Sequence, residues 1–279
     1  DRPRRSGEEV DVGEGTRGGE FMICSAGVSR CRGNPPLDRK SETGSHEHPE
    51  QSVHHGNLTP EGSPRPRTAI LGAAMYVPAY ARLDSELIAP LVRAHPFALL
   101  CSELKGAPFA THLPLLLEEE SGVAWLRGHV ARANPHWQAW DGERASMAVF
   151  RGPHAYVSPR WYLSANEVPT WNYLAAHASG RPRAVQDASW LRALLRRMAE
   201  RFDPEWGAQS PTPEAAQRQA SLLGGIVGFE MRVEQWTGKA KLGQNKSAAD
   251  REGAARGLEA TKRPEDAAVA AQMRNVRQD

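Results

Sequence analysis

The sequence predicts a mainly β fold with helices, of the α+β class, built around a small antiparallel barrel. Between residues 97 and 158, short apolar runs follow one another and are separated by tight turns that contain Gly and Pro, a spacing typical of small barrels. After residue 187, apolar residues recur at helical spacing instead. A polar N-terminal stretch shows neither pattern and is expected to stay outside the barrel.

That stretch, residues 1–74, is predicted to be a disordered extension, because Gly, Pro, His and charged residues replace the aliphatic periodicity that a core requires. Its histidines lack the spaced Cys or carboxylate partners of a defined site, so no metal is expected. Met75 opens the first stretch that looks folded. We therefore hypothesise that Met75 is the biological start and that residues 1–74 are not part of the native protein.

Charge and cysteine content narrow the class of protein. The formal net charge is only +2 over 279 residues, so no strong field would draw the chain to nucleic acid or to an anionic membrane. Cys24, Cys31 and Cys101 provide neither a disulfide framework nor a CxxC pair, which favours a reducing compartment. No apolar run approaches the ~18–20 residues that span a bilayer. We therefore expect a cytoplasmic protein with no membrane partner.

The first folded elements are a helix and three strands. Asp84 or Ser85 is expected to cap a short helix, although Pro90 should kink it or delay its start. The three strands are predicted at residues 97–103, at 108–117 with an interruption at Pro114, and at 123–129.

The remaining elements follow a short helix near residues 137–140. Two strands separated by Gly152 and Pro153 are predicted at residues 145–151 and 154–158, and a long strand at 226–236. Helices are predicted at residues 187–202, where Asp187 is the cap, at 213–223, at 248–258 and at 265–273. The last two helices are expected to be peripheral.

Residues 128–137, GHVARANPHW, form the first candidate site. They follow a strand-like run and bring a guanidinium, an amide and unpaired backbone N–H groups into one bend, which suits a phosphate. Asn134 and Pro135 fit the start of a short helix. The alternative is an ordinary capped turn whose Arg132 points into solvent.

A second candidate lies at Thr111 and His112, beside Pro114. A Pro inside a strand implies an edge or a bulge, which leaves backbone groups free for a ligand. Because His129 and Arg132 come from a neighbouring hairpin strand, a common pocket is plausible. The alternative for His112 is a satisfied, half-buried histidine.

The chain also contains an ordered series of blocks that resembles a known family. These blocks are residues 75–78 (MYVP), 95–98 (HPFA), 110–115 (ATHLPL), 128–135 (GHVARANP), 152–159 (GPHAYVSP), 161–162 (WY), 168–173 (VPTWNY) and 241–247 (KLGQNKS). Together, from Met75 to about Leu258, they resemble the PaiB-type FMN-binding negative transcriptional regulators. Such proteins are similar to the FMN-binding split-barrel flavoproteins, which bind flavin mononucleotide at a homodimer interface.

The resemblance implies FMN as cofactor and a set of residues that bind it. Arg132 would pair with the phosphate, supported by Asn134, while Thr111 and His112 would lie along the ribityl chain or the ring edge. The Trp171 segment would contact the ring system, or would be a core or dimer-contact strand. The full set is Thr111, His112, Leu113, Pro114, Gly128, His129, Arg132, Asn134, Trp171, Lys241, Gln244 and Asn245.

The resemblance also implies a domain plan and a function. Residues 75–260 would form an FMN-binding split β-barrel domain, and residues 261–279 a peripheral C-terminal helix and tail. The protein would be a negative transcriptional regulator that holds FMN as a bound ligand at a homodimer interface. The alternatives are a flavin-dependent oxidoreductase that uses a reduced nicotinamide or another small redox substrate, and a barrel that has lost its flavin. No catalytic residue is assigned, and no DNA or regulatory partner is evident.

Aromatic residues give a separate reason to expect a dimer. Trp161, Tyr162, Trp171 and Tyr173 are more than a small barrel is expected to bury in one subunit, and exposed aromatic clusters mark interfaces. The helix at residues 187–202 carries several arginines on its polar side. For that basic side a solvated surface is favoured over a DNA contact.

Overall fold

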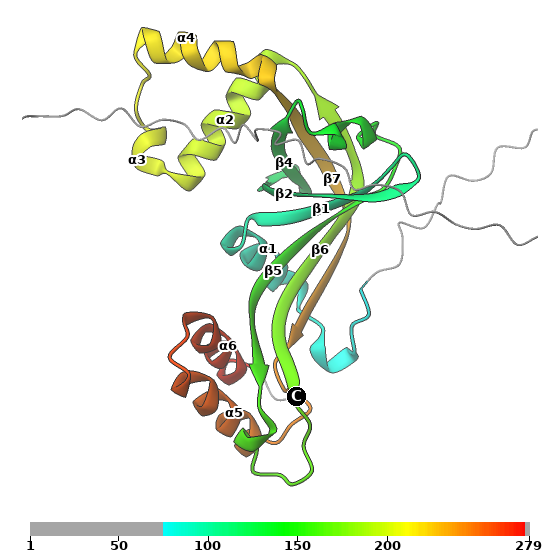
Figure 1. Cartoon of the computed structure of the whole chain (residues 1–279), viewed down its shortest axis with the longest axis vertical. Helices are drawn as coiled ribbons and strands as arrows, with labels where there is room; N and C mark the ends of the chain where they lie inside the picture. The colour runs from blue at the N-terminus through cyan, green and yellow to red at the C-terminus, as the bar shows by residue number, and fades with distance from the viewer. Residues whose placement is uncertain (1–74, 277–279) are drawn as a thin grey trace, which may run out of the picture. The chain divides into compact units, whose positions relative to one another are not determined.

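The computed structural model describes residues 75–276 (Figure 1). The predicted disordered extension, its histidines and the hypothesis that residues 1–74 precede the native start at Met75 all concern residues 1–74, which lie outside the described residues. The strands are β1 (Phe97–Leu104), β2 (Ala107–Pro114), β3 (Leu116–Glu120), β4 (Val123–Ala131), β5 (Ser146–Val157), β6 (Thr170–Val185) and β7 (Ile226–Lys241). The α-helices are α1 (Ser85–Ala94), α2 (Ala188–Phe202), α3 (Pro204–Gly207), α4 (Pro213–Leu222), α5 (Ala248–Ala260) and α6 (Pro264–Arg274), and the 3-10 helices are η1 (Ala79–Ala81), η2 (Pro135–Ala139), η3 (Pro159–Trp161) and η4 (Leu223–Gly225).

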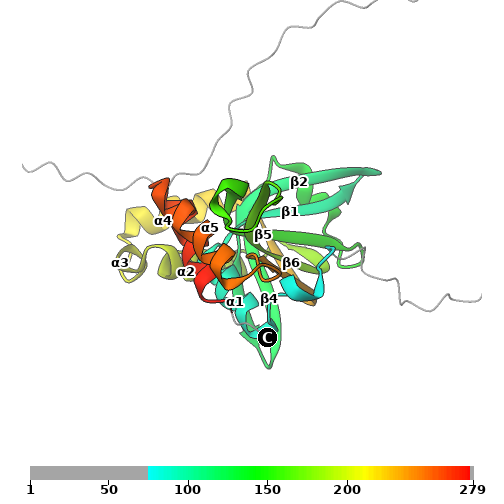
Figure 2. The same ribbon diagram turned by 90° about the horizontal axis from the view of Figure 1, so that it is seen from below.

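All seven strands form one antiparallel sheet in the order β2-β1-β5-β6-β7-β4-β3. Figure 2 shows β2, β1, β5 and β6 side by side in that order. The two edge strands, β2 and β3, are consecutive in the chain and are separated only by Leu115. Because one bent segment supplies both edges, the sheet curls into a split barrel, as the sequence predicts.

The bend occurs where the sequence places Pro114. Pro114 is the last residue of β2, and the next amide, that of Leu115, donates to the Pro96 carbonyl oxygen at 2.9 Å. Gly128 on β4 lies against this bend: an added Cβ would stand 2.8 Å from the Pro114 carbonyl oxygen and 2.9 Å from Leu115 Cδ2. The barrel closes there because position 128 carries no side chain.

The predicted strands at 145–151 and 154–158 are one strand, β5, with a register shift between Arg151 and His154. A β-bulge therefore occupies the place where Gly152 and Pro153 predict a turn. At Gly152 an added Cβ would lie 2.8 Å from Leu91 Cδ1, which shows how closely α1 packs on this strand.

Strand β6 is the element that the sequence pattern did not predict beyond its first residues. It contains 16 residues, and most of those on its buried side are small, such as Ala176, Ala178 and Gly180. Small residues carry little strand propensity. They are required here because the neighbouring strand is close: an added Cβ on Gly180 would lie 2.1 Å from the Arg232 carbonyl oxygen.

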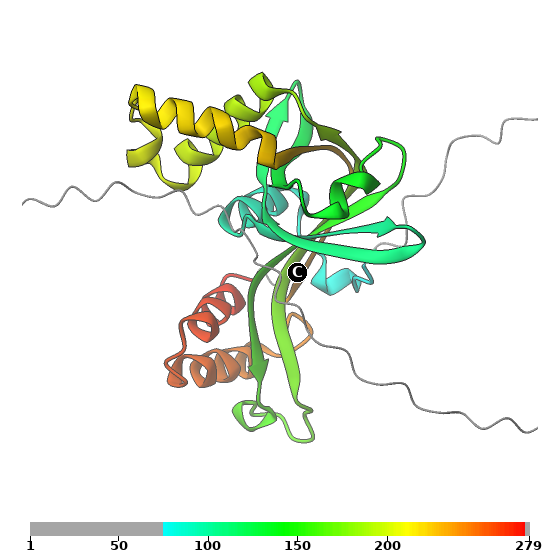
Figure 3. The same cartoon turned by 45° about the horizontal axis from the view of Figure 1, so that its top comes forward.

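Helices α2, α3 and α4 lie at one end of the long strands β6 and β7, helices α5 and α6 lie at the other end, and α1 lies between the two groups (Figures 1 and 3). Helix α2 starts at its predicted cap, since the Asp187 carboxylate accepts from the Trp190 amide at 2.7 Å. Helix α1 begins at Ser85 and continues through Pro90, which is exposed, so the expected delay of its start is wrong. No helix of residues 75–276 is long and apolar enough to cross a membrane.

Helices α5 and α6 are not peripheral, contrary to the sequence-based expectation. Leu258 of α5 and Val269 of α6 are fully buried, and Met273 of α6 is 1 % exposed, all within the main core. Alanine-rich helices carry a weak apolar pattern, which is why the sequence did not reveal their buried faces. Trp161 and Tyr162 also pack within their own chain: an added Cβ on Gly257 would lie 2.2 Å from the Trp161 ring, and Tyr162 is 9 % exposed.

Candidate functional site

A buried chain of polar side chains lies where the predicted bend meets the barrel. His136, in η2, is fully buried, and its ring nitrogens contact two hydroxyls: Nδ1 lies 2.8 Å from Thr111 Oγ1 and Nε2 lies 2.9 Å from Ser102 Oγ. Ser102 Oγ in turn lies 2.6 Å from Ser146 Oγ. Asn134 Nδ2 donates to Thr111 Oγ1 at 3.1 Å, so the chain runs from Asn134 to Ser146.

This polar chain is neutral. Burial lowers the pKa of His136 to about 4, so the imidazole is uncharged near neutral pH and uses one nitrogen as donor and the other as acceptor. The rings of Phe109 and Trp140 pack against it at centroid distances of 5.0 and 5.2 Å. The buried His136 ring and its hydrogen bonds therefore hold Thr111, and through it Asn134, in place.

The local sequence explains how η2 starts here. The Asn134 side chain accepts from the His136 amide at 3.0 Å, and Pro135 occupies the first helical position, as the sequence predicts. The indole of Trp137 donates to the Arg132 carbonyl oxygen at 3.1 Å, which holds the bend closed.

Arg132 lies at the outer side of the bend and binds neutral groups. Its Nε donates to the Gly224 carbonyl oxygen at 2.7 Å, Nη2 to the Ile226 carbonyl oxygen at 3.2 Å and Nη1 to Gln186 Oε1 at 2.8 Å. In the described part of the chain no carboxylate pairs with this guanidinium, so its charge is not compensated. It holds the start of β7 and retains full positive charge toward an anion.

The other predicted residues near the bend lie on different faces of the sheet. Thr111 pairs with buried Leu100, whereas His112 lies on the opposite face of β2, where its ring stacks on exposed Phe97 at 6.0 Å. His129 pairs with Gly228, whose added Cβ would meet the Trp190 ring of α2, so His129 lies on the face that α2 covers. Burial lowers the pKa of His129, and its Nδ1 has no partner. Leu113, Pro114 and Gly128 lie where the barrel closes.

The remaining predicted residues lie at the far end of β6 and β7. Trp171 is 54 % exposed and contacts Tyr156 and His154 at ring distances of 6.1 and 6.2 Å. Lys241 Nζ donates to the Trp171 carbonyl oxygen at 3.0 Å and to Thr170 Oγ1, and burial lowers the pKa of this lysine. Gln244 accepts from the Leu242 amide at 2.8 Å and donates to the Ala240 carbonyl oxygen at 2.5 Å. Asn245 is exposed.

Within one chain, the predicted residues near the bend lie far from those near Trp171. Arg132 binds the carbonyl oxygen of the first residue of β7, and Lys241 is the last residue of that 16-residue strand. At about 3.3 Å per residue the strand extends about 50 Å between them, and Figure 1 shows β7 running from the side of α2 to the side of α5. We call them the Arg132 end (Thr111, Arg132, Asn134 and His136) and the Trp171 end (Trp171, Lys241, Gln244 and Asn245).

Sequence reasoning missed His136, Ser102 and Ser146. His136 lies within the decapeptide that the sequence singled out, but neither serine lies in a motif. Both serines line a pocket of about 500 Å³ whose wall also contains Cys101, Glu103 and Met147. The alternation of β1, in which Ser102 follows buried Ala98 and Leu100 on one face, was the available signal.

Comparison with known proteins gives one family. Residues 75–235 match the family model described as "Putative FMN-binding domain". The chain is 34 % identical over 182 residues to the protease synthase and sporulation protein PAI 2 of Bacillus subtilis, covering 63 % of this chain and 85 % of that protein. It is 26 % identical over 237 residues to an uncharacterized protein of Aspergillus fumigatus, covering 66 % and 91 %.

Among solved structures, the flavocytochrome Anf3 from Azotobacter vinelandii superposes with a TM-score of 0.46 at 20 % identity, covering 60 % of this chain and 73 % of that one.

Proposed function

The chain belongs to the FMN-binding family whose model spans its residues 75–235, and its cofactor is FMN; from that premise we propose that two copies of the chain hold each flavin between them. One copy supplies the Arg132 end and the other the Trp171 end. The observation that carries this proposal is the separation of about 50 Å along β7, which is longer than an FMN molecule.

The Arg132 end fits the phosphate. Arg132 offers a guanidinium bound only to neutral acceptors, and Asn134 brings an amide donor to the same bend. A planar guanidinium suits a phosphate dianion better than an ammonium does. His136 does not contact the ligand in this proposal: both of its ring nitrogens are used, and it holds Thr111 in place.

The Trp171 end fits the ring system. Trp171 exposes an aromatic surface on which an isoalloxazine ring can stack. Lys241 lies beside it and reaches no carboxylate among residues 75–276. These two side chains would close the site that Arg132 begins in the partner copy.

The outer face of the sheet supports a dimer. Leu99, Val149 and His177 lie in one row across β1, β5 and β6, opposite to the core, and Cys101 and Met147 lie in the next row. All are only half-buried. Phe97 is 64 % exposed on the same face. An apolar sheet face with exposed aromatic residues is typical of a homodimer interface.

FMN supplies electron and hydride transfer when it is bound. We propose that this chain nevertheless holds it as the retained ligand of a negative transcriptional regulator. The likeness to PaiB-type regulators supports this role.

The test combines three measurements on one flavin-loaded sample: flavin per chain from the visible spectrum, oxidation of NADH and NADPH, and mobility shift of a DNA fragment carrying the promoter of its own gene. The proposal expects one FMN per chain, no nicotinamide oxidation beyond that of free FMN, and a shifted DNA band. Sustained nicotinamide oxidation without a shifted band would contradict the regulator proposal and indicate an FMN-dependent oxidoreductase.

A further inference from the structure

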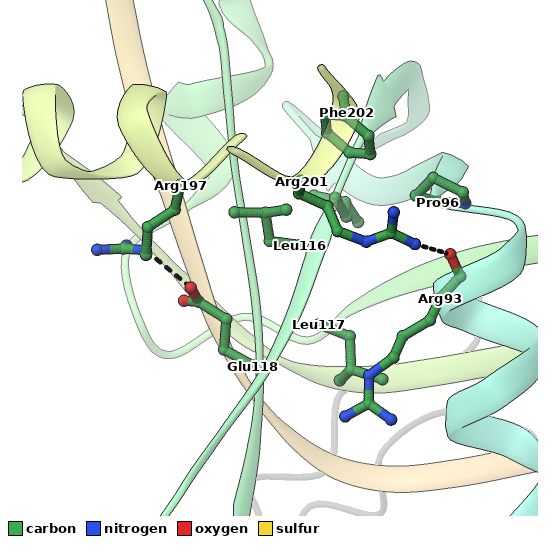
Figure 4. Close-up of a pocket in the computed structure, with 9 residues that line it drawn as sticks. Arg93, Pro96, Leu116, Leu117, Glu118, Arg197, Arg201 and Phe202 are labelled. Carbon is green, nitrogen blue, oxygen red and sulfur yellow. Dashed lines mark hydrogen bonds and ion pairs between the residues drawn. The ribbon is translucent and has the colours of Figure 1, made fainter. Parts of the chain in front are cut away.

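The pocket between α1, β3 and the last turns of α2 does not gather its polar groups at one point (Figure 4). Arg197 pairs with Glu118 at 2.7 Å, and Arg201 donates to the Arg93 carbonyl oxygen at 2.7 Å. The guanidinium groups of Arg93 and Arg201 point to different sides. These contacts hold α2 against β3 and α1. The buried polar chain behind Thr111 is different, because each of its side chains is hydrogen-bonded to the next.

The polar chain has one more hydrogen than its own links use. Its links join Thr111 Oγ1 to His136 Nδ1, His136 Nε2 to Ser102 Oγ, and Ser102 Oγ to Ser146 Oγ. Three hydroxyl groups and one neutral imidazole bring one polar hydrogen each, whereas each of the three links uses one hydrogen. One hydrogen is therefore left over, either on Thr111 or at the serine end of the chain.

The tautomer of His136 decides which end keeps the spare hydrogen. With the ring proton on Nδ1, the imidazole donates to Thr111 and accepts from Ser102, so the Thr111 hydroxyl hydrogen is free to bind another group. With the ring proton on Nε2, every link reverses: Thr111 donates to the ring, and the spare hydrogen lies on Ser102 or Ser146.

Burial favours the tautomer that leaves the spare hydrogen on Thr111. Among residues 75–276, no further acceptor binds the hydroxyl of Thr111, Ser102 or Ser146. Ser102 and Ser146 are only 9 % and 4 % exposed, whereas Thr111 is half-buried. An unpaired donor costs more where water cannot reach it.

Asn134 is compatible with this direction of the chain. Its Oδ1 accepts from the His136 amide at 3.0 Å, which turns its Nδ2 toward Thr111 at 3.1 Å. Thr111 Oγ1 then accepts from the Asn134 amide and from the imidazole, and both of its acceptor positions are filled. The only hydrogen-bonding capacity left on Thr111 is its own hydroxyl hydrogen.

We propose, on the basis of the proposed flavin site, that His136 carries its proton on Nδ1 and thereby makes Thr111 a hydrogen-bond donor to the FMN phosphate. A phosphate dianion offers only acceptor oxygens, so it binds the spare Thr111 hydrogen and disfavours the reverse tautomer, which presents no donor there. His136 is a positioning residue, since it acts through Thr111. Thr111 then helps to distinguish FMN from riboflavin, which has no phosphate.

Nitrogen-15 NMR of the histidine side chains in the full-length, FMN-loaded protein reads the tautomer directly. The measurement is made at pH 7, where His136 is neutral because burial lowers its pKa to about 4. Its signals are identified by their loss in His136→Gln or, should that variant not fold, by their resistance to protonation down to about pH 4. We expect the proton on Nδ1, and a proton on Nε2 would overturn the proposal.

Thr111→Val keeps the shape of the side chain and removes the hydroxyl. A proton on Nδ1 would then have no acceptor, so the proton should move to Nε2, which can still donate to Ser102. FMN binding should weaken about tenfold, since one charge-assisted hydrogen bond is lost, and riboflavin binding less than twofold. Thr111→Ser retains the hydroxyl and should keep the proton on Nδ1 and the FMN affinity within about threefold.

The matched control is Thr237→Val, the same change at another half-buried strand position. It should leave the His136 tautomer unchanged and alter FMN affinity less than twofold. If Thr111→Val does not fold, the tautomer in the unchanged protein and in Thr111→Ser decides. An FMN affinity of Thr111→Val within twofold of the original, or equal losses for FMN and riboflavin, would overturn the proposal. Failure of the flavin site itself looks different, because Arg132→Ala would then weaken FMN and riboflavin binding equally.

Discussion

The Arg132 end and the Trp171 end of the sheet are built in opposite ways. At the Arg132 end, His136 is fully buried and every polar atom of its ring has a partner. At the Trp171 end, the indole ring is 54 % exposed, and the lysine beside it binds a backbone carbonyl oxygen and a hydroxyl. At the Arg132 end the buried ring nitrogens are all bonded within one chain, whereas the Trp171 end exposes an aromatic surface to the outside.

This difference suits the two ends to different parts of the flavin in the proposed dimer. A rigid, pre-organised end can bind a charged group with little loss of entropy, which suits the flavin phosphate. An exposed aromatic ring gains from burial against another surface. In the proposed shared site, the Arg132 end would recognise the charge of the phosphate and the Trp171 end the apolar ring system.

The largest expected effect is on phosphate recognition. Arg132→Ala should weaken FMN binding about ten- to a hundredfold while riboflavin binding changes little, because a charge-assisted contact to phosphate contributes about 1.5–3 kcal/mol. Fluorescence titration of both ligands measures this. Trp171→Ala is the matched variant at the other end and should weaken both ligands equally. Equal losses for Arg132→Ala would instead assign Arg132 to its bonds with Gly224 and Ile226.

The neutral histidine should make stability depend on pH. The pKa of His136 is about 4, below its ordinary value of 6.5, so the unfolded chain takes up a proton first as pH falls. Its contribution to the free energy of unfolding is full above pH 6.5 and declines to a loss of up to about 3 kcal/mol near pH 4.

Urea unfolding across this range checks the effect in His136→Gln, which should show a shallower decline than the original protein. Burial also lowers the pKa of His129 and His177, so part of the slope should remain. A slope that His136→Gln leaves unchanged would contradict the assignment.

Gly128→Ala should destabilise the Arg132 end by about 1–3 kcal/mol, because the new methyl group would overlap the Pro114 carbonyl oxygen. Gly224→Ala is the matched control, since nothing lies within 4 Å of an added Cβ there. Thermal melting of both variants measures the difference. Equal melting temperatures would mean that the barrel does not close tightly at Gly128.

The smallest effect is expected from removing residues 1–74. Residues 1–74 are rich in Gly, Pro, His and charged residues and carry little aliphatic content, so FMN affinity and melting temperature should be unchanged. A truncated chain that melts several degrees lower, or binds FMN more weakly, would show that the extension contributes to one of the ends.

Much of the fold was predictable because its strands follow strong local signals. The interruption at Pro114, the cap at Asp187 and the Asn134–Pro135 start are each set by one residue's backbone or side-chain chemistry. Strand β6 was missed because Ala176, Ala178 and Gly180 fit a close strand pair, which only the folded sheet creates.

The sequence indicated single residues of the candidate site but not how they are arranged in space. Asn134 donates to Thr111, but His112, which the sequence grouped with Thr111, lies on the other face of β2, since neighbouring residues of a strand point to opposite sides. The length of β7 separates Lys241 from Arg132, and no local sequence pattern predicts that separation. His136 was missed because its partners Ser102 and Ser146 come from distant strands.

The central claim is that each flavin site takes one end from each of two chains, and subunit mixing tests it most directly. Arg132→Ala and Trp171→Ala proteins, each deficient in FMN binding, are unfolded together and refolded, and the tagged heterodimer is isolated. Its flavin content is then measured from the visible spectrum. A shared site predicts one intact FMN site per heterodimer, because the unchanged Arg132 and the unchanged Trp171 meet on one side. A heterodimer that binds no more FMN than either parent would contradict the claim.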